Sequence, residues 1–460
     1  MIQLRPGQRI HMIGIGGAGL SAIARVLLDR GFTVTGSDLK ANAFTAALAA
    51  DGARIDIGHE ARYVQGADIV LATSAASADH VEIAAARALN IPVFNRRDFI
   101  SAVLRDTDTI AVAGAHGKTT TTSMIIHILR CAGEDPSFIV GGALAGSGAN
   151  AGVGAGPSFV IEADEYDNMF HGLQPDLAVI TNIEHDHPDF FKSPRQLTEA
   201  FRRFVDGIKP GGVLVVCADD EGALALAAEW RAEGGRVTTY GIANSAADWR
   251  ARDLRHSGDK SIAKVARAGL PDLELRLGRP GAHNLLNALA ALIVANKRGL
   301  SPEKGAAALA SFKGAARRFE IRGERDGVIV IDDYAHHPTE IRVNIDAARQ
   351  RYPERQIWAI WQPHTYSRVQ QFWAQFVDAL ADADEVLVTP IFAAREAPVA
   401  GISSAAMAQA IARLTPAAFA PSFDEAVEML QRRAQAPAVA LIFSAGDANQ
   451  IADLYLGSEA

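Results

Sequence analysis

Short apolar runs alternate with helix-like segments along most of the chain. The runs that fit buried strands occupy residues 10–13, 32–35, 69–72, 93–94, 110–113, 159–161, 177–180, 213–217, 328–331, 357–361 and 386–390. Segments with helical spacing of apolar residues follow several of these runs, for example at 20–30 and 124–129. This alternation predicts an α/β fold with mostly parallel sheets.

The stretch 110–122 has the features of a phosphate-binding loop. An apolar run ends in a glycine turn, Gly117 and Lys118 follow, and a helix-like segment begins with four threonines. Glycines let backbone N–H groups approach an anion, and a helix N-terminus favours negative charge. Lys118 would contact the β- and γ-phosphates, and Thr119 would contact Mg²⁺. Val112 stands where the general P-loop pattern has its first glycine, so an ordinary glycine-rich turn is the alternative.

The beginning of the chain has the pattern of a Rossmann-type βαβ unit. A strand-like run leads into a glycine cluster, a helix-like segment and a second strand, after which Ser37 and Asp38 follow. In such units the glycines face a diphosphate and the acid binds a ribose hydroxyl. The cluster alone leaves NAD, FAD and a UDP-sugar open as ligands. Arg96 follows a later strand, and a solvated loop is the alternative for it.

Acidic residues and histidines crowd the ends of two strands after the phosphate-binding loop. Glu162, Asp164 and Glu165 follow one strand, and residues 184–187 follow the next. Carboxylates this close repel one another unless a metal or a basic partner lies beside them. The arrangement favours a Mg²⁺ site over a zinc site because oxygen ligands dominate and thiolates are missing, and a charged strand end in solvent is the alternative.

Polar clusters also follow the strands of the last third of the chain. They occupy residues 332–337 and 362–368, at the carboxyl ends of strands, where open α/β sheets bind ligands. Before them, a helix-like segment carries Asn284 and Asn287 on one face. His283 at its start could contact a nucleotide base or cap the helix.

Composition narrows the class of protein. The chain has 460 residues, which suggests about three domains, and its formal net charge of −8 argues against a nucleic-acid partner. Cys131 and Cys217 lack the spacing of a metal site or a disulfide, which fits a reducing cytoplasm. The N-terminus does not resemble a signal peptide. The uncharged stretch 136–161 contains seven glycines and would make a poor membrane helix, so we expect no membrane partner.

Together, the motifs resemble those of the Mur ligases over essentially the whole chain. The matching segments are residues 14–21, 36–38, 114–120, 162–165, 181–187, 283–287, 317–319, 332–338 and 362–368. The resemblance implies a UDP-sugar-binding Rossmann-like domain at 1–105, a central P-loop ATPase-like domain with a parallel sheet at 106–314, and a C-terminal Rossmann-like ligase domain at 315–460.

Within the family, the motifs look most like those of members that join L-alanine to UDP-N-acetylmuramate. The resemblance then implies ATP and Mg²⁺ as cofactors and an acyl phosphate as intermediate. Glu165, Tyr166 and Asp167 also look like members that attach a recycled peptide to the same UDP-sugar, and this activity is the alternative. Ala115 replaces the usual loop threonine, and Ser444 stands where a glycine is commoner. Many members of the family have a carbamylated lysine near this part of the chain. Arginines stand at 202 and 203 here, so we expect no such lysine in this chain.

The resemblance also implies which residues form the sites. The expected catalytic residues are Lys118, Glu162, His187, His336 and Arg368, and the expected Mg²⁺ ligands are Thr119, Glu162 and His187. ATP contacts are expected from Gly114, Ala115, His116, Gly117, Lys118, Thr119, Thr120, His283, Asn284, Asn287, Arg317 and Asp332. UDP-sugar contacts are expected from Gly16, Gly17, Ala18, Gly19, Ser37, Asp38, Thr73, Ser74, Ala75 and Arg96. The amino acid and the acyl phosphate are expected at Arg318, Tyr334, His336 and Arg368.

Two other classes of function fit parts of the sequence. An NAD-dependent oxidoreductase would account for the first βαβ unit, but it leaves the phosphate-binding loop and the carboxylates around Glu162 unexplained. A nucleotide-binding regulator without catalysis would account for the loop, but it leaves the polar strand ends of the last third unexplained.

Overall fold

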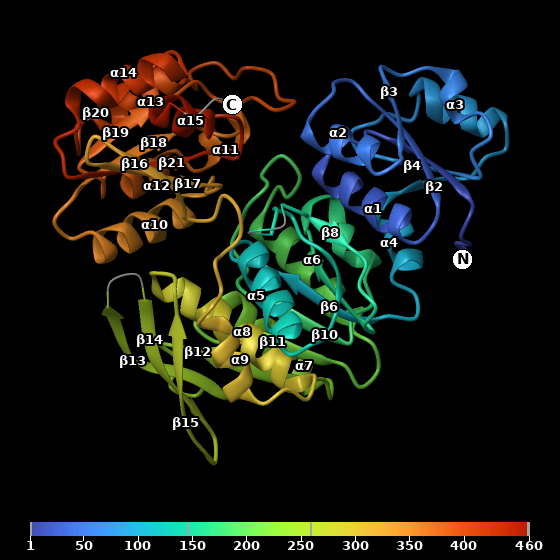
Figure 1. Ribbon diagram of the computed structural model, residues 1–460, viewed down its shortest axis with the longest axis horizontal. Coiled ribbons are helices and arrows are strands. Elements are labelled where there is room, and N and C mark those ends of the chain that lie inside the picture. Colours follow the sequence, from blue (N-terminus) through green and yellow to red (C-terminus); the bar gives the residue numbers. More distant parts are fainter. Residues whose placement is uncertain (1, 145, 147, 258–259, 458–460) are drawn as a thin grey trace. The chain divides into compact units, whose positions relative to one another are not determined.

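A computed structural model describes residues 2–144, 146, 148–257 and 260–457 (Figure 1). Helices and strands alternate along the chain and form three sheets, which confirms the predicted α/β class. The chain packs as two compact units. The first contains residues 1–183, 195–250 and 289–308, and the second contains residues 184–194, 251–288 and 309–460.

The N-terminal sheet has the strand order β3-β2-β1-β4-β5, and its strands are parallel. Its elements are β1 (Arg9–Ile13), α1 (Ala18–Asp29), β2 (Thr33–Asp38), α2 (Ala43–Ala50), β3 (Arg54–Ile57), η1 (Ala61–Val64), β4 (Ile69–Ala72), α3 (Val81–Ala88), β5 (Val93–Asn95) and α4 (Arg96–Val103). The strand order reverses between β1 and β4, and ligands of doubly wound sheets bind outside the carboxyl ends at such a point.

The central sheet of the first unit runs in the order β12-β11-β10-β6-β9-β7-β8. Its elements are β6 (Asp108–Ala113), α5 (Lys118–Cys131), β7 (Ser137–Ile139), β8 (Ala151–Gly152), β9 (Ser158–Glu162), η2 (Tyr166–Gly172), β10 (Leu177–Ile180), α6 (Pro194–Asp206), β11 (Val213–Cys217), α7 (Glu221–Ala232) and β12 (Arg236–Gly241). The strands are parallel except for β8, which runs antiparallel to β7. β6 therefore lies between β9 and β10, and all three end at the same edge.

The segment after β12 contains three further strands and two helices. Its strands are β13 (Trp249–Ser257), β14 (Lys260–Arg267) and β15 (Leu270–Leu277), and they are followed by α8 (Ala282–Lys297) and α9 (Pro302–Leu309). β14 and β15 form a long antiparallel hairpin (Figure 1). No helix in the described part of the chain combines the length and apolar character needed to cross a bilayer.

The C-terminal sheet has the order β16-β17-β21-β18-β19-β20, with β16 antiparallel to β17 and parallel pairing across the rest. Its elements are β16 (Glu320–Arg325), β17 (Val328–Asp333), α10 (Pro338–Arg351), β18 (Gln356–Trp361), α11 (Tyr366–Gln371), α12 (Trp373–Leu380), β19 (Glu385–Val388), α13 (Ser404–Ile411), β20 (Ala417–Phe419), α14 (Phe423–Arg433), β21 (Ala438–Phe443) and α15 (Gln450–Leu456).

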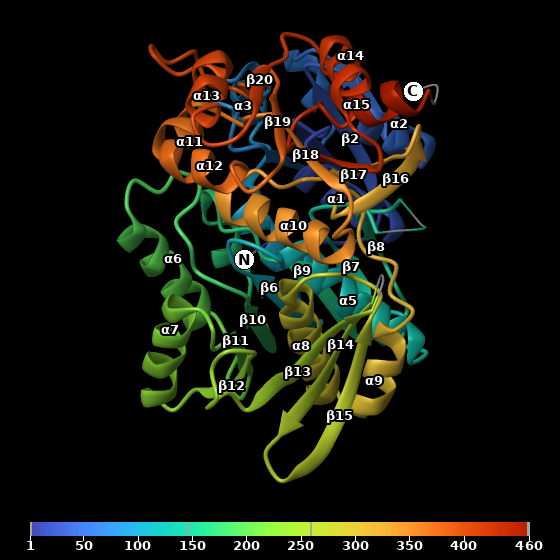
Figure 2. The ribbon, with the colours of Figure 1, turned by 90° about the vertical axis from the view of Figure 1, so that its left-hand side faces the viewer.

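Alternating side chains of these strands build one apolar core on each face of the C-terminal sheet. Ile345 of α10 and Phe376 of α12 pack in one core, and Leu430 of α14 and Ile451 of α15 pack in the other. Figure 2 shows α10 and α12 on one side of the sheet and α14 and α15 on the other. Burying one such side chain contributes about 1.5–3 kcal/mol, so the two cores hold the polar strand ends on a rigid support.

Candidate functional site

The loop between β6 and α5 has the backbone of an anion cradle. Gly114 and Gly117 have φ of 138° and 80°, values that favour glycine. A Cβ at Gly114 would overlap the hydroxyl of Thr181, so a larger residue does not fit there. Gly117 caps α5 without a side-chain hydrogen bond. The first N–H groups of the helix, at Lys118 and Thr119, therefore have the arrangement that binds phosphate.

The end of β10 braces this loop from the side. The side-chain oxygen of Asn182 accepts a hydrogen bond from the His116 N–H at 2.9 Å, and its amide donates to the His116 carbonyl at 3.1 Å. The Thr181 hydroxyl donates to the same carbonyl at 2.6 Å. Because β10 pairs directly with β6, Thr181 and Asn182 hold the loop beside the carboxyl ends of these two strands.

The ammonium group of Lys118 lies over its own loop. Its Nζ donates to the Gly114 carbonyl at 2.5 Å and the Ala115 carbonyl at 3.1 Å, and it lies 3.0 Å from Glu165 Oε2. Burial opposes the charge of Lys118, but the carboxylates of Glu165 and Glu162 outweigh it and raise the pKa. Lys118 is therefore a cation held where a phosphate would bind.

Each of the three carboxylates near this loop has its own partner. Glu165 pairs with Lys118, and Asp164 accepts a hydrogen bond from Arg96 at 2.7 Å. Glu162 accepts from the Thr119 hydroxyl at 2.9 Å and from the Gly141 N–H at 2.7 Å. Basic partners therefore compensate two of the carboxylates. The third lies beside a hydroxyl, and an oxygen-donor pair of this kind suits Mg²⁺.

The N-terminal sheet brings several of the expected UDP-sugar residues together. Asp38 accepts a hydrogen bond from the Gly16 N–H at 2.8 Å. A Cβ at Gly19 would overlap the guanidinium of Arg96, so these residues are in close contact. Thr73 packs against the first glycine of the cluster at the end of β4, where Ser74 and Ala75 are exposed. Gly17 and Ala18 begin α1 at the same edge of the sheet.

Ser37 differs from the other residues expected to contact the UDP-sugar. Its side chain is fully buried, and its hydroxyl donates a hydrogen bond to Glu82 at 2.8 Å. The hydroxyl therefore faces the interior of the domain, where it is held by Glu82.

In the second unit, Arg317 and Asp332 form one pair. Arg317 Nε donates to Asp332 Oδ2 at 3.1 Å, and Nη2 donates to the Ser444 carbonyl at 2.7 Å. Burial raises the pKa of Asp332, although Arg317 opposes the shift. The guanidinium groups of Arg317 and Arg318 lie 5.2 and 5.3 Å from the ring centre of Tyr334, a distance that allows cation–π attraction.

A second cluster of charged groups surrounds Asp186, which is 3% exposed. Arg368 Nε donates to Asp186 Oδ1 at 2.9 Å, and the His187 N–H donates to the same oxygen at 2.6 Å. Arg368 also contacts His364 Nδ1 at 2.9 Å, and His336 Nε2 lies 3.8 Å from Asp186. Burial would raise the pKa of Asp186, but the charge of Arg368 holds it well below its usual range.

Two histidines of this cluster, His336 and His364, are neutral near pH 7. Burial and the charge of Arg368 lower the pKa of His336 to about 4, and burial together with the groups around it lowers the pKa of His364 to about 3. His336 Nδ1 lies 2.9 Å from the Tyr334 carbonyl, an arrangement in which Nδ1 donates its proton and Nε2 keeps the lone pair.

The first two turns of α8 carry the expected adenosine residues. The Asn284 side chain donates to the Pro280 carbonyl at 2.7 Å, and Asn287 is also buried. Burial lowers the pKa of His283 to about 4, so this ring is neutral near pH 7. The three side chains lie within two turns of one helix, as their spacing predicted.

Three family models match successive parts of the chain. The Mur ligase family, catalytic domain matches residues 9–107, the Mur ligase middle domain matches 112–295, and the Mur ligase, glutamate ligase domain matches 317–446. The chain belongs to the Mur ligase family.

Named relatives of this Mur ligase match it along nearly its whole length. The UDP-N-acetylmuramate–L-alanine ligase of Renibacterium salmoninarum is 43% identical and is aligned over 98% of this chain and 95% of that protein. The crystal structure of UDP-N-acetylmuramate-alanine ligase from Thermotoga maritima is 30% identical, covers 98% of each chain and has a TM-score of 0.83. The structure of a murein peptide ligase from Psychrobacter arcticus is 26% identical over 98% of each chain, with a TM-score of 0.72.

Several residues that shape the sites of this Mur ligase were given no individual role in the sequence analysis. Thr181 and Asn182 brace the phosphate-binding loop, and Asp186 holds Arg368. Glu165 pairs with Lys118. All four follow apolar strands at the carboxyl edge, so their position after a strand was the available signal. The sequence did not show which of these polar residues bind ligands and which hold the ligand-binding residues in place.

Proposed function

We propose that this chain joins L-alanine to the carboxylate of UDP-N-acetylmuramate in an ATP-dependent reaction of peptidoglycan biosynthesis. Relatives named for this activity, 43% and 44% identical over at least 96% of the chain, are the observation that carries the proposal. They favour alanine over the recycled peptide, as does the higher TM-score to the alanine ligase structure, 0.83 against 0.72.

The chemistry of the reaction explains why a ligase needs a phosphate-binding loop. A carboxylate accepts an amine poorly because its oxygen is a poor leaving group. The muramyl carboxylate therefore attacks the γ-phosphorus of ATP, ADP departs, and an acyl phosphate forms. The amine of alanine then attacks the acyl carbon, and the tetrahedral intermediate collapses to the amide and inorganic phosphate. Phosphoryl transfer mainly requires positioning and neutralisation of charge.

Lys118 is the group proposed to neutralise the transferring phosphate. Its ammonium contacts the carbonyls of Gly114 and Ala115 and can turn from them toward an anion above the loop. We assign Thr119, Glu162 and His187 as the ligands of Mg²⁺, and the Thr119 hydroxyl and Glu162 carboxylate already lie 2.9 Å apart. When bound, Mg²⁺ would neutralise further charge on the phosphates.

The remaining contacts of the nucleotide are assigned by the same reasoning. His283, Asn284 and Asn287 supply a neutral ring and two amides for adenosine, and Arg317 with Asp332 adds a cation and an acceptor. The backbone of Gly114 through Thr120 supplies N–H groups to the phosphates.

Arg318, Tyr334, His336 and Arg368 are proposed to handle the amino acid and the acyl phosphate. A guanidinium such as that of Arg318 can pair bidentately with the carboxylate of alanine. The lone pair on Nε2 of neutral His336 suits an amine N–H. Gly16, Gly17, Ala18, Gly19, Asp38, Ser74, Ala75 and Arg96 are proposed to bind the UDP-sugar, with Ser37 and Thr73 supporting them.

We place the reaction in the cytoplasm. The cysteines Cys131 and Cys217 are both free thiols, as expected in a reducing compartment. The net charge of −8 argues against a nucleic-acid partner.

The test is whether release of ADP and phosphate requires both UDP-N-acetylmuramate and an amino acid. We expect no release when either is omitted, and release without the muramyl substrate would refute the proposal. A competition among L-alanine, L-serine, glycine and a tripeptide then measures selectivity. Preferential incorporation of the tripeptide would replace alanine ligation with peptide recycling.

A further inference from the structure

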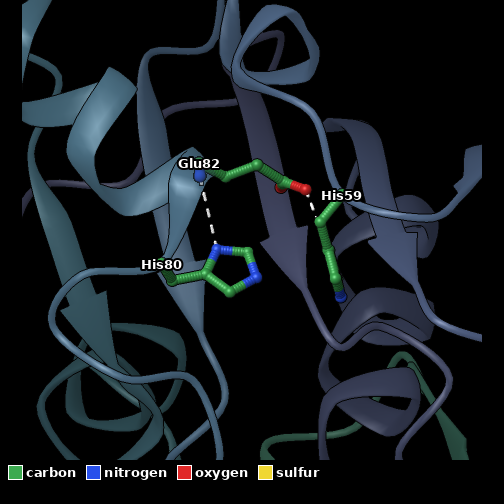
Figure 3. A group of neighbouring side chains, drawn as sticks. All are labelled: His59, His80 and Glu82. Atoms are coloured by element: carbon green, nitrogen blue, oxygen red, sulfur yellow. Dashed lines mark hydrogen bonds and ion pairs between the residues drawn. The ribbon is translucent and has the colours of Figure 1, made fainter.

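Three potential metal ligands converge in the N-terminal sheet domain. His59 follows β3, His80 is the N-cap of α3, and Glu82 lies in the first turn of that helix (Figure 3). One ligand atom from each residue lies within 4.8 Å of those of the other two. We propose that His59, His80 and Glu82 bind a transition-metal ion of the zinc class, separately from the magnesium assigned to Thr119 and Glu162.

The carboxylate of Glu82 is prepared as an anionic ligand. It is fully buried, and its Oε2 lies 2.7 Å from His11 Nε2 and accepts from Ser37 Oγ at 2.8 Å. Groups of this kind behind a ligating carboxylate fix its orientation and raise metal affinity. His11 is itself held, with Nδ1 2.9 Å from Thr35 Oγ1.

The two imidazoles complete the donor set. His59 Nδ1 lies 2.9 Å from Glu82 Oε1, and two ligands of one tetrahedral zinc ion are about 3.3 Å apart. A metal ion could therefore take the place of the proton between His59 Nδ1 and Glu82 Oε1 if these two atoms moved apart by a few tenths of an ångström. The rings of His59 and His80 are 4.5 Å apart at their centres.

The type and exposure of the ligands select the class of metal. Two imidazoles and one carboxylate are a known zinc donor set that leaves a fourth position open, whereas Mg²⁺ prefers oxygen ligands alone. The side chain of His59 is 18% exposed while that of Glu82 is fully buried. An ion can therefore approach from the imidazole side and meet the fixed carboxylate behind it.

The test uses the full chain, titrated with Co²⁺ in the presence of excess Mg²⁺. Tetrahedral Co²⁺ absorbs visible light, and Zn²⁺ should displace it. His80→Asn removes the imidazole but keeps a good N-cap for α3. We expect this variant and His59→Asn to bind Co²⁺ at least about tenfold more weakly than the wild type. Zn²⁺ should raise the melting temperature of the wild type more than that of either variant.

A second pair of groups provides the matched control. His127 Nε2 lies 3.6 Å from Cys131 Sγ, so Cys131→Ser tests whether Co²⁺ binds there instead. We expect Cys131→Ser to bind Co²⁺ like the wild type. The proposal is overturned if the wild type gives no Co²⁺ spectrum, if both histidine variants bind as tightly as the wild type, or if Cys131→Ser abolishes the spectrum. Circular dichroism of the metal-free variants should match the wild type, which separates lost binding from lost folding.

Discussion

The phosphate-binding loop and the Asp186 cluster each contain a buried cation–carboxylate pair. In the first, Lys118 pairs with Glu165, and their side chains are 14% and 2% exposed. In the second, Arg368 pairs with Asp186, and both side chains are 4% exposed. The partners are 47 residues apart in the first pair and 182 residues apart in the second.

The two pairs differ in how firmly the cation is held. Lys118 has a single ammonium on a flexible stem, and two of its contacts are backbone carbonyls of its own loop. Arg368 has a rigid guanidinium whose nitrogens meet Asp186, His364 and His187. A lysine of this kind can change partners when an anion binds. The arginine has little freedom, so we expect it to position the cluster as well as to contact a ligand.

Lys118→Ala should have the largest effect on activity, because it removes the mobile cation from the transferring phosphate. We expect turnover to fall on the order of a thousandfold, or about 4 kcal/mol of transition-state stabilisation. The measurement is ADP release in the presence of both substrates. Near-normal activity would contradict the assigned role.

A double variant separates charge from packing in the same pair. Lys118→Ala alone leaves the buried Glu165 without its ammonium, which should also destabilise the fold. Adding Glu165→Gln removes the uncompensated charge, so we expect the double variant to recover stability and to remain inactive. Recovery of activity would mean that Lys118 matters only as the partner of Glu165.

Arg368→Met should have the largest effect on stability. It leaves Asp186 buried without its main cation, a change that typically costs about 3–5 kcal/mol. Urea unfolding measures the loss. Glu428→Gln breaks the exposed pair with Arg432, whose side chains are 56% and 75% exposed, and should cost only about 0.3–0.5 kcal/mol. Similar losses in the two variants would contradict the contrast between buried and surface pairs.

The sequence predicted the elements of both regions about equally well. The apolar runs matched β6, β10, β17 and β18 because buried parallel strands are continuously apolar. The phosphate-binding loop was also predictable, since Gly117 and Lys118 are contiguous and only a strand and a helix need to flank them.

The Asp186 cluster was harder to predict because its members come from distant segments. Asp186 and Arg368 meet only once the fold is formed, and nothing in the spacing of the chain pairs them. The left-handed backbone at His187 (φ 54°) and Thr365 (φ 61°) also aims these segments in ways that residue types do not reveal. Ser37 shows the same limit, because its buried hydroxyl depends on Glu82 from another element.

The pH dependence of stability is a further property of the Asp186 cluster. His364 has a pKa of about 3 in the folded chain and an ordinary value of 6.5. Between these values the unfolded chain binds the proton and the folded chain does not, so stability falls as pH drops below about 6.5. The slope is at most about 1.4 kcal/mol per pH unit for each such histidine.

His364→Gln should make that fall in stability shallower, because one of the histidines that resist protonation is gone. His336, with a folded pKa of about 4, would still contribute. Asp333 acts in the opposite sense, since burial raises its pKa to about 7 and it binds a proton more readily when folded. For this reason the comparison is the difference in slope between wild type and variant across the acidic range, measured by urea unfolding. Equal slopes would show that His364 does not contribute to the acid sensitivity of the cluster.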